Sequence, residues 1–281
     1  MSERRRIYKY LSASGIKTLR TGLLKFSPPS EFNDPFEMQP FLVNVAPEDQ
    51  VEREFAERYE SLVEEGYRKL PQPIRERATY EQYRAFAEAK KSQSLQNLKG
   101  LFHSMAPAMR EKFLASINST LGVFCMTEAH DSLLMWAHYA DKHRGFVLEF
   151  NREHAFFSRK RGPNDEFNQL LPVLYSSARP NDYLANMDVT SVFLTKSEDW
   201  RYEQEWRILA PLSECTVNRD GIHLYEFPPE CVTGVIFGCK IAQADENEMM
   251  EVLKSGRRYA HVVCTRARLD EKEYRLHFES V

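Results

Sequence analysis

The chain has 281 residues, of which 42% are hydrophobic, 12% aromatic and 28% charged. This composition is typical of a globular protein. It excludes a disordered chain, which lacks aromatic residues, and a fibrous chain, which is built from a simple repeat. The formal net charge of −3 excludes a strong overall field that would attract nucleic acid or an anionic membrane.

The apolar stretches and the cysteines argue against further classes of protein. The longest apolar stretches have the length of strands, well below the ~20 residues of a membrane helix, and no apolar signal segment follows the basic N-terminus. The five cysteines are scattered and form no Cys-x-x-Cys pair, which argues against a disulfide framework and a zinc site. We therefore expect a cytoplasmic protein with no membrane partner and no bound metal.

The chain begins with two predicted strands, at 7–11 and 23–26. On the first strand Tyr8 and Tyr10 share one face, and Lys9 lies on the other. A lysine at this position can bind a phosphate, but a lysine that protects an edge strand from aggregation is the cheaper explanation.

The loop that follows the second strand contains Asn33 and Asp34. These side chains either bind substrate hydroxyls or hold the loop through turns with their own backbone. The spacing alone favours the structural role.

Between residues 47 and 119 the chain is dense in charge, and apolar residues recur at intervals of three and four. We predict three helices here, separated by prolines at positions 71, 73 and 107. This segment is predicted to be a helical lobe inserted in a β-rich domain formed by 1–46 and 120–281. Because an insert adds surface without rebuilding the core, the lobe is the expected contact for an acceptor or partner.

The second half of the chain is predicted to be mostly strand, with helices at 132–140 and 243–253. We expect Asp131 to cap the first of these helices and Gly145 to end it in a left-handed conformation. The predicted strands lie at 121–126, 146–150, 171–175, 189–194, 203–211, 222–227 and 232–237, and near 260–264 and 274–278. The fold class is therefore α+β: a mixed, mostly antiparallel sheet, with or without a split, and an inserted helical lobe.

Three side chains of the helix at 132–140 are candidates for a site. Trp136 lies on the apolar stripe and is expected in the core. His138 lies off the stripe, where a surface position is commoner than a cleft position. Tyr139 follows directly. His138 and His143 lack the spacing of a helical metal pair, so no metal site is predicted.

The stretch 203–208 is the most informative one. On a strand, Glu203, Glu205 and Arg207 share one face, while Trp206 and Ile208 share the other. Two carboxylates placed in this way can stabilise a developing cation and orient a hydroxyl nucleophile. The competing interpretation is a solvent-facing strand with a weak Glu–Arg pair, and the pattern alone favours it.

Several common catalytic motifs are absent from the sequence. It contains no Gly-x-Gly-x-x-Gly, no Walker-type Gly-Lys-Ser/Thr and no Gly-x-Ser-x-Gly. These absences argue against a dinucleotide-fold dehydrogenase, a P-loop enzyme and an α/β-hydrolase.

Three blocks of the sequence resemble the bacterial family called domain of unknown function 2971. The blocks are Tyr8-Lys9-Tyr10 with 26–37; Cys125-Met126-Thr127-Glu128 with 133–141, His143 and Gly145-Phe146; and Phe193-Leu194-Thr195-Lys196 with Trp200 and 202–207. They cover most of the chain outside the predicted lobe. The family has no agreed activity.

The family pattern in turn resembles a remote ADP-ribosyltransferase. Such folds carry His or Arg on a first strand, a Ser/Thr-rich second strand and a Glu, often in Glu-x-Glu, on a later strand. The corresponding residues here are Lys9, Thr127 and Glu205, in the same order. Two departures weaken the likeness: Lys9 replaces His or Arg, and Cys125-Met126-Thr127 is a thin version of Ser-Thr-Ser. The comparison is one of order and residue type.

This resemblance implies an enzyme that consumes NAD, either an ADP-ribosyltransferase or an NAD glycohydrolase. NAD would lie in a cleft of the sheet, with Lys9 and Thr127 positioning ribose and phosphate groups and Tyr10 or Tyr139 stacking on nicotinamide. Glu205 would stabilise the transition state. The residues implied to hold the cleft, the substrate or an unidentified acceptor are Tyr8, Asn33, Asp34, Trp136, His138, Glu203 and Arg207.

Two other functions stay open. A metal-dependent nuclease or nucleotide-processing factor of a defence system needs acidic ligands, and Asp34, Glu37, Glu149 and Glu203 are available. In a non-catalytic binding module the motifs would serve packing alone, and the two acids of 203–205 would face solvent away from any pocket.

Overall fold

The structure is a computed structural model that describes residues 6–163 and 165–281. The chain forms two compact units, one of residues up to 39, 116–179 and 190–281, and one of residues 40–115 and 180–189. The predicted domain limits, with a lobe at 47–119, stay a prediction. In the described residues, no helix is both long enough and apolar enough to cross a membrane.

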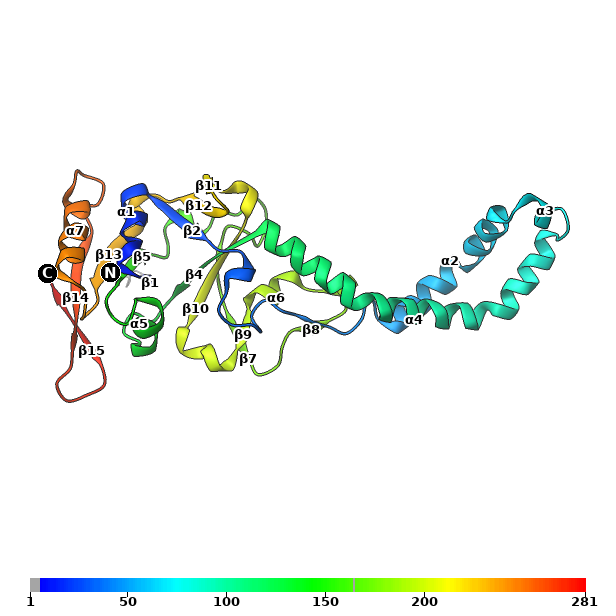
Figure 1. The fold of residues 1–281 in the computed structure, drawn as a ribbon, viewed down its shortest axis with the longest axis horizontal. Coiled ribbons are helices and arrows are strands. Elements are labelled where there is room, and N and C mark those ends of the chain that lie inside the picture. Colours follow the sequence, from blue (N-terminus) through cyan, green and yellow to red (C-terminus); the bar gives the residue numbers. More distant parts are fainter. Residues whose placement is uncertain (1–5, 164) are drawn as a thin grey trace. The chain divides into compact units, whose positions relative to one another are not determined.

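The first unit is built on an eight-stranded sheet with the order β15-β14-β13-β5-β1-β4-β10-β6 (Figure 1). Only the β13–β14 pair is parallel among these neighbours in the described chain. The predicted α+β class with a mixed, mostly antiparallel sheet is therefore confirmed. The strands are β1 (Arg6–Leu11), β4 (Leu121–Thr127), β5 (Phe146–Asn151), β6 (Leu170–Pro172), β10 (Glu205–Pro211), β13 (Val232–Phe237), β14 (Val263–Leu269) and β15 (Leu276–Ser280).

The sheet opens between β1 and β4. β1 pairs with β5 along its whole length, from Arg6 to Leu11, but its register with β4 is limited to Tyr8 opposite Thr127. On its other side, β4 pairs with β10 along its whole length, from Leu121 to Thr127. A strand pair joined at one end leaves a gap at the other end, and the candidate site lies there.

Smaller elements surround this sheet. A second sheet contains β2 (Leu23–Phe26), β11 (Val217–Arg219) and β12 (Ile222–Glu226), and a parallel pair joins β7 (Leu174–Ser176) to β9 (Thr195–Ser197). The helices are α1 (Lys17–Thr21), α5 (Leu133–Tyr139), α6 (Val189–Leu194) and α7 (Gln243–Lys254), and the 3₁₀ helix η5 spans Glu198–Glu203.

The second unit is mainly helical. It holds α2 (Glu48–Lys69), α3 (Gln72–Arg75), most of α4 (Tyr80–Thr120) and the short parallel pair of β3 (Phe41–Leu42) and β8 (Asn181–Asp182). The prediction of a helix break at Pro107 is wrong, because this proline lies inside α4. A proline removes one backbone hydrogen bond, and a helix of 41 residues retains enough others to continue.

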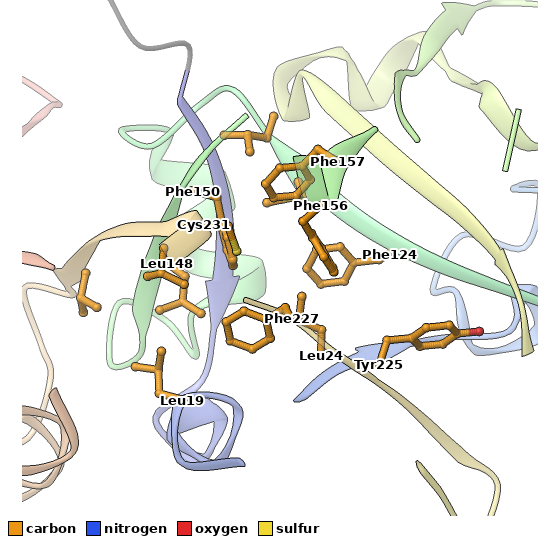
Figure 2. Close-up of a cluster of buried hydrophobic side chains, with 14 of the residues drawn as sticks. Leu19, Leu24, Phe124, Leu148, Phe150, Phe156, Phe157, Tyr225, Phe227 and Cys231 are labelled. Carbon is orange, nitrogen blue, oxygen red and sulfur yellow. The ribbon is translucent and has the colours of Figure 1, made fainter. Parts of the chain in front are cut away.

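Hydrophobic side chains fill both faces of the main sheet. The larger cluster contains aromatic rings from several elements, among them Phe124, Phe150, Phe157 and Phe227 (Figure 2). The smaller cluster lies under α5 and includes Tyr8, Tyr10 and Trp136, which confirms the predicted core position of the tryptophan. Ile7 belongs to the larger cluster and Tyr8 to the smaller one, as expected for successive strand residues.

Other local predictions are corrected by the structure. Residues 189–194 form helix α6 and not a strand, because burial of Val192, Phe193 and Leu194 outweighs their β preference. Lys9 does not lie on an edge strand, since β1 has neighbours on both sides.

The end of α5 also differs from the prediction. Ser132, and not Asp131, caps the helix by accepting a hydrogen bond from the Met135 backbone. The left-handed residues after α5 are Asp141, Lys142 and His143, and not Gly145. Gly145 is instead needed for close packing, as a Cβ there would lie 2.0 Å from the Leu11 carbonyl oxygen.

Candidate active site between strands β1 and β4

A cavity of about 340 Å³ opens into the gap between β1 and β4, within the first unit. This volume lies near the lower end of the ~300–1,000 Å³ that small-molecule sites occupy. Its lining combines aromatic, basic and acidic side chains, and most of the predicted site residues contribute: Tyr8, Lys9, Tyr10, Asn33, Thr127, Tyr139, Glu203 and Glu205.

Strand pairing brings the three sequence motifs together. Tyr8 lies opposite Thr127, and Thr127 lies opposite Glu205 on its other side. The three motifs therefore form one row across neighbouring strands, although more than 190 residues separate the first from the last. All three residues of the row line the cavity.

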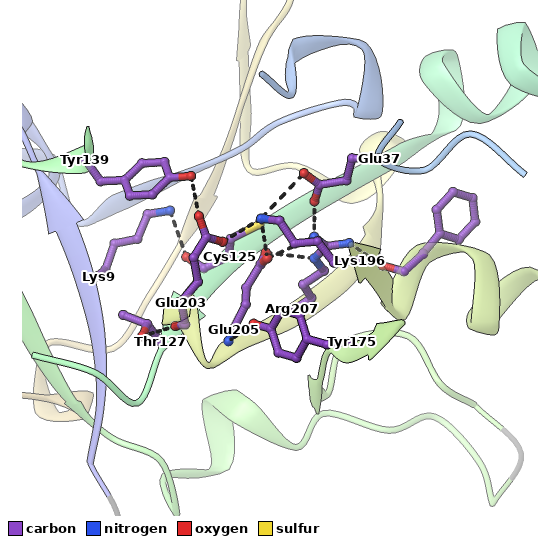
Figure 3. Close-up of polar contacts among 11 residues, drawn as sticks. Lys9, Glu37, Cys125, Thr127, Tyr139, Tyr175, Lys196, Glu203, Glu205 and Arg207 are labelled. Atoms are coloured by element: carbon purple, nitrogen blue, oxygen red, sulfur yellow. Dashed lines mark hydrogen bonds and ion pairs between the residues drawn. The ribbon is translucent and has the colours of Figure 1, made fainter. Parts of the chain in front are cut away.

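Lys196 of β9 lies between three carboxylates at the cavity floor (Figure 3). Its Nζ is 2.5 Å from Glu203 Oε2, 2.9 Å from Glu205 Oε2 and 3.5 Å from Glu37 Oε2. All four side chains are at most 5% exposed. A charge this deeply buried requires partners of opposite sign, and each ion here has at least one.

Arg207 lies behind this lysine and is fully buried. Its Nε is 2.8 Å from Glu205 Oε1, its Nη1 donates to the Phe193 carbonyl at 2.5 Å, and its Nη2 donates to Glu205 and Glu37. Figure 3 shows Lys196 and Arg207 both in contact with the carboxylate of Glu205. The alternative of a solvent-facing strand with a weak Glu–Arg pair is therefore wrong.

The cations set the ionisation of the acids. Burial alone would raise the pKa of Glu205, but Arg207 and Lys196 outweigh it and hold this pKa well below its usual range. Burial also favours the neutral amine of Lys196, yet Glu205 and the other two acids raise its pKa. For Glu37, burial dominates over Arg207 and raises the pKa. The site therefore holds a firmly ionised Glu205 and a Glu37 that is protonated more readily.

A left-handed residue directs both acids of 203–205 into the cavity. Glu203 ends η5, and Gln204 has φ 44° and ψ 50° before β10 begins at Glu205. The predicted strand that would include Glu203 is thus wrong at its start. Thr127 Oγ1 donates to the Glu203 carbonyl, and the Glu205 backbone donates to the Tyr175 hydroxyl at 2.7 Å, so both ends of this turn are fixed.

Lys9 differs from the other lysines of the cavity. Its Nζ donates to the Cys125 carbonyl at 2.8 Å and lies 5.0 Å from the Phe124 ring centroid. Among the described residues it has no carboxylate within ion-pair distance, whereas Lys25 pairs with Glu31 at 2.6 Å. Burial lowers the pKa of Lys9.

Tyr139 lines the cavity and is hydrogen-bonded to one of its acids. Its hydroxyl donates to Glu203 Oε1 at 2.6 Å. Burial, followed by this hydrogen bond, raises its pKa, so the phenol stays neutral. Tyr10 is more deeply packed, with its hydroxyl on the Ala129 carbonyl and its ring against Trp136.

Four predicted site residues do not line the cavity. Asp34 accepts a hydrogen bond from the Phe36 backbone, Trp136 donates from the core to the His130 carbonyl, and His138 is exposed. Arg207 lies behind Glu205 and reaches the cavity only through it.

The acids proposed for a metal-dependent nuclease are also dispersed. Glu149 pairs with Arg6 and Thr233, away from Glu37 and Glu203. No group of three or more His, Cys, Asp or Glu residues that could hold a metal ion occurs in the described chain. Where Glu37, Glu203 and Glu205 approach each other, the Lys196 ammonium lies among them.

Sequence reasoning did not predict Lys196 as a site residue. It belongs to the third motif block, but its position on a three-residue strand gives no periodic signal. Cys125 also lines the cavity, although the sequence marks it only as part of a motif, and burial holds the pKa of its thiol well above the usual value.

Comparison with known families gives one match. Residues 135–208 match the model of a family described as "Protein of unknown function (DUF2971)". This confirms the predicted family for the segment that runs from α5 to Ile208 and includes Lys196, Glu203 and Glu205. Comparisons with curated proteins and with solved structures gave no match.

Proposed function

We propose that the cavity cleaves the nicotinamide–ribose bond of NAD and passes the ADP-ribosyl group to water or to an acceptor. The observation that supports this most directly is the row of three motifs across β1, β4 and β10. One residue of each motif, Lys9, Thr127 and Glu205, lines the same cavity, in the order that the resemblance to ADP-ribosyltransferases implies.

The charges at the floor suit this chemistry. As the C1′–N bond breaks, its electron pair leaves with nicotinamide, which departs neutral and needs no proton. The ribose then carries a developing positive charge at C1′, which ionised carboxylates stabilise in a site that excludes water. Arg207 and Lys196 keep Glu205 ionised even though it is buried.

The contacts of other lining residues suggest their roles in this reaction. Lys9 has no carboxylate within ion-pair distance among the described residues and would bind a phosphate of the substrate. The Tyr139 ring would contact nicotinamide, and its hydroxyl holds Glu203 in place. The attacking water or acceptor hydroxyl forms the new C–O bond and gives its proton to Glu203, because Arg207 and Lys196 hold Glu205 ionised.

Nicotinamide release from NAD tests this proposal. Replacing Glu205 with Gln removes the charge but keeps the shape, so we expect a loss of roughly 10²–10⁴ in rate. The matched control is Glu246→Gln, which removes another buried acid, paired with Arg266 away from the cavity. The control should retain the wild-type rate.

A second variant tests the proposal even if Glu205→Gln loses activity because it fails to fold. Tyr139→Phe keeps the ring and removes the hydroxyl that donates to Glu203. We expect this variant to melt near the wild type and to release nicotinamide more slowly. Equal release by the wild type, Glu205→Gln and Tyr139→Phe would contradict the proposal, as would a wild-type rate no higher than that of buffer.

A further inference from the structure

A second cavity, of about 420 Å³, lies elsewhere in the first unit. It is formed by β1, β5, β13, β14 and β15, together with the segment that follows β4. Tyr8 lines both this cavity and the first one, so the two share a wall. Apart from Tyr8, no described residue that lines the second cavity also lines the first.

Aromatic side chains form a wall on one side of the second cavity. The imidazole of His130 lies between the rings of Tyr8 and Phe278, with centroid distances of 5.0 Å and 4.9 Å. Ile236 of β13, which belongs to the same hydrophobic cluster as Tyr8, extends this wall. A wall of this kind suits a planar heteroaromatic group, which gains dispersion and stacking contacts on burial.

Two charged residues, Glu149 and Arg6, line the cavity beside polar residues such as Asn151, Thr233 and His261. Glu149 Oε1 accepts from Thr233 at 2.7 Å and Oε2 accepts from Arg6 at 3.2 Å, with the carboxylate side chain 13% exposed. An ionised carboxylate has about four acceptor sites, so it can still accept from two hydroxyls. Arg6 is 60% exposed and uses one nitrogen here, which leaves N–H donors for an anion.

Together these groups match the parts of a nucleotide. A carboxylate that accepts from vicinal ribose hydroxyls is a recurrent feature of nucleotide sites, and a guanidinium is well suited to phosphate. We propose that the second cavity binds a nucleoside monophosphate unit, with the base on the aromatic wall, the ribose hydroxyls on Glu149 and the phosphate on Arg6.

Calorimetric titration of the full chain with AMP tests the site without any assumption about catalysis. We expect saturable binding that weakens about 10-fold to 100-fold in Glu149→Gln, because hydrogen bonds to a charged acceptor are lost. Glu279→Gln is the matched control: it removes an exposed acid of β15 that does not line the cavity, and it should bind as the wild type does. 2′-Deoxy-AMP should bind the wild type more weakly than AMP, a comparison that needs no variant.

The nucleotide has two plausible sources, and kinetics distinguish them. If it is the AMP half of a dinucleotide whose other half enters the first cavity, Glu149→Gln raises KM for NAD but leaves turnover of nicotinamide mononucleotide unchanged. If it is a separate mononucleotide, Glu149→Gln changes neither, and AMP does not compete with NAD. This distinction rests on the proposed function, whereas the binding test does not.

The outcomes of the two proposals can be told apart. Absence of binding by AMP, GMP, CMP and UMP at millimolar concentration would overturn the second site, as would binding that Glu149→Gln and loss of the 2′-hydroxyl both leave unchanged. Absence of nicotinamide release from both NAD and nicotinamide mononucleotide would overturn only the proposed function.

Discussion

Lys196 is the shared partner of three buried glutamates, which all approach its one ammonium group. A lysine in this position does two things at once. It offsets the repulsion between Glu203 and Glu205, and with Arg207 it keeps Glu205 ionised without water. The arrangement is costly to assemble, since each ion leaves its hydration shell, and it depends on every partner being present.

Removal of this lysine should therefore destabilise the fold. In Lys196→Met the buried acids lose their shared partner, and the expected loss in the free energy of unfolding is about 3–5 kcal/mol. Lys25→Met is the matched control, because Lys25 is 46% exposed and its pair with Glu31 should contribute less than ~1 kcal/mol. Urea unfolding of both variants measures the difference, and equal losses would contradict the role assigned to Lys196.

The opposite pKa shifts of Glu205 and Glu37 predict opposite pH dependences. Glu205 has a lowered pKa in the fold, so its stabilising contribution is present above the ordinary carboxyl pKa of about 4.3 and is lost as the pH falls through the lower, folded value. Glu37 has a raised pKa, so its contribution is present below about 4.3 and is lost as the pH rises through the higher, folded value.

Gln variants at the two positions make this difference measurable. Glu205→Gln should destabilise the protein more near neutral pH than near pH 3, whereas Glu37→Gln should destabilise it less near neutral pH than near pH 4, because Gln imitates a protonated Glu. The free energy of unfolding across this pH range gives both trends. Parallel trends for the two variants would show that the assigned ionisation states are wrong.

At the scale of elements, the turn after α5 places Gly145 where no side chain fits. A Cβ there would lie 2.0 Å from the Leu11 carbonyl oxygen, and backbone cannot move aside as a flexible side chain can. Gly145→Ala should therefore lower the stability by about 1–3 kcal/mol or more, the usual range for overpacking. Gly162→Ala, where nothing lies within 4 Å of the added Cβ, should leave the melting temperature nearly unchanged. A melt of Gly145→Ala that matches this control would contradict the close approach.

The elements also explain which parts of the site could be predicted from the sequence. Strand periodicity correctly separated Lys9 from Tyr8 and Tyr10, because alternation depends only on backbone geometry. It failed at Glu203, since a single left-handed residue, Gln204, resets the direction of the side chains. No local sequence pattern identifies such a residue, because its left-handed conformation depends on tertiary packing.

The same limit applies to Lys196 and to helix α6. Lys196 lies on a three-residue strand that exists because it pairs with β7, and that pairing joins residues far apart in the sequence. The stretch at 189–194 has strand-like composition, yet the burial it gains as a helix is decided by its neighbours. Contacts with other parts of the chain therefore determine the structure of both segments, and the local sequence pattern cannot predict it.

At the scale of the whole molecule, the two units differ in how much hydrophobic surface they bury. The first holds both hydrophobic clusters of the main sheet. The buried hydrophobic side chains described for the second unit are few: Leu42, Ala46, Val51, Tyr59, Val63 and Ala106. Its exposed ion pairs, such as Arg84 with Glu60, add little. Since apolar burial is the main stabilising term, the second unit should open at a lower free energy than the first.

Native-state hydrogen exchange tests this difference, with the amides of α2 expected to exchange through a smaller opening than those of β5. Val63→Ala removes buried methyl groups from α2 and should lower the local stability by about 1.5 kcal/mol, or roughly tenfold in exchange rate. Leu62→Ala, at a position that is 40% exposed on the same helix, should have a much smaller effect. Because β5 packs in a separate core, its amides should keep the wild-type rate in both variants. Equal acceleration of α2 and β5 in Val63→Ala would mean that the two units unfold as one.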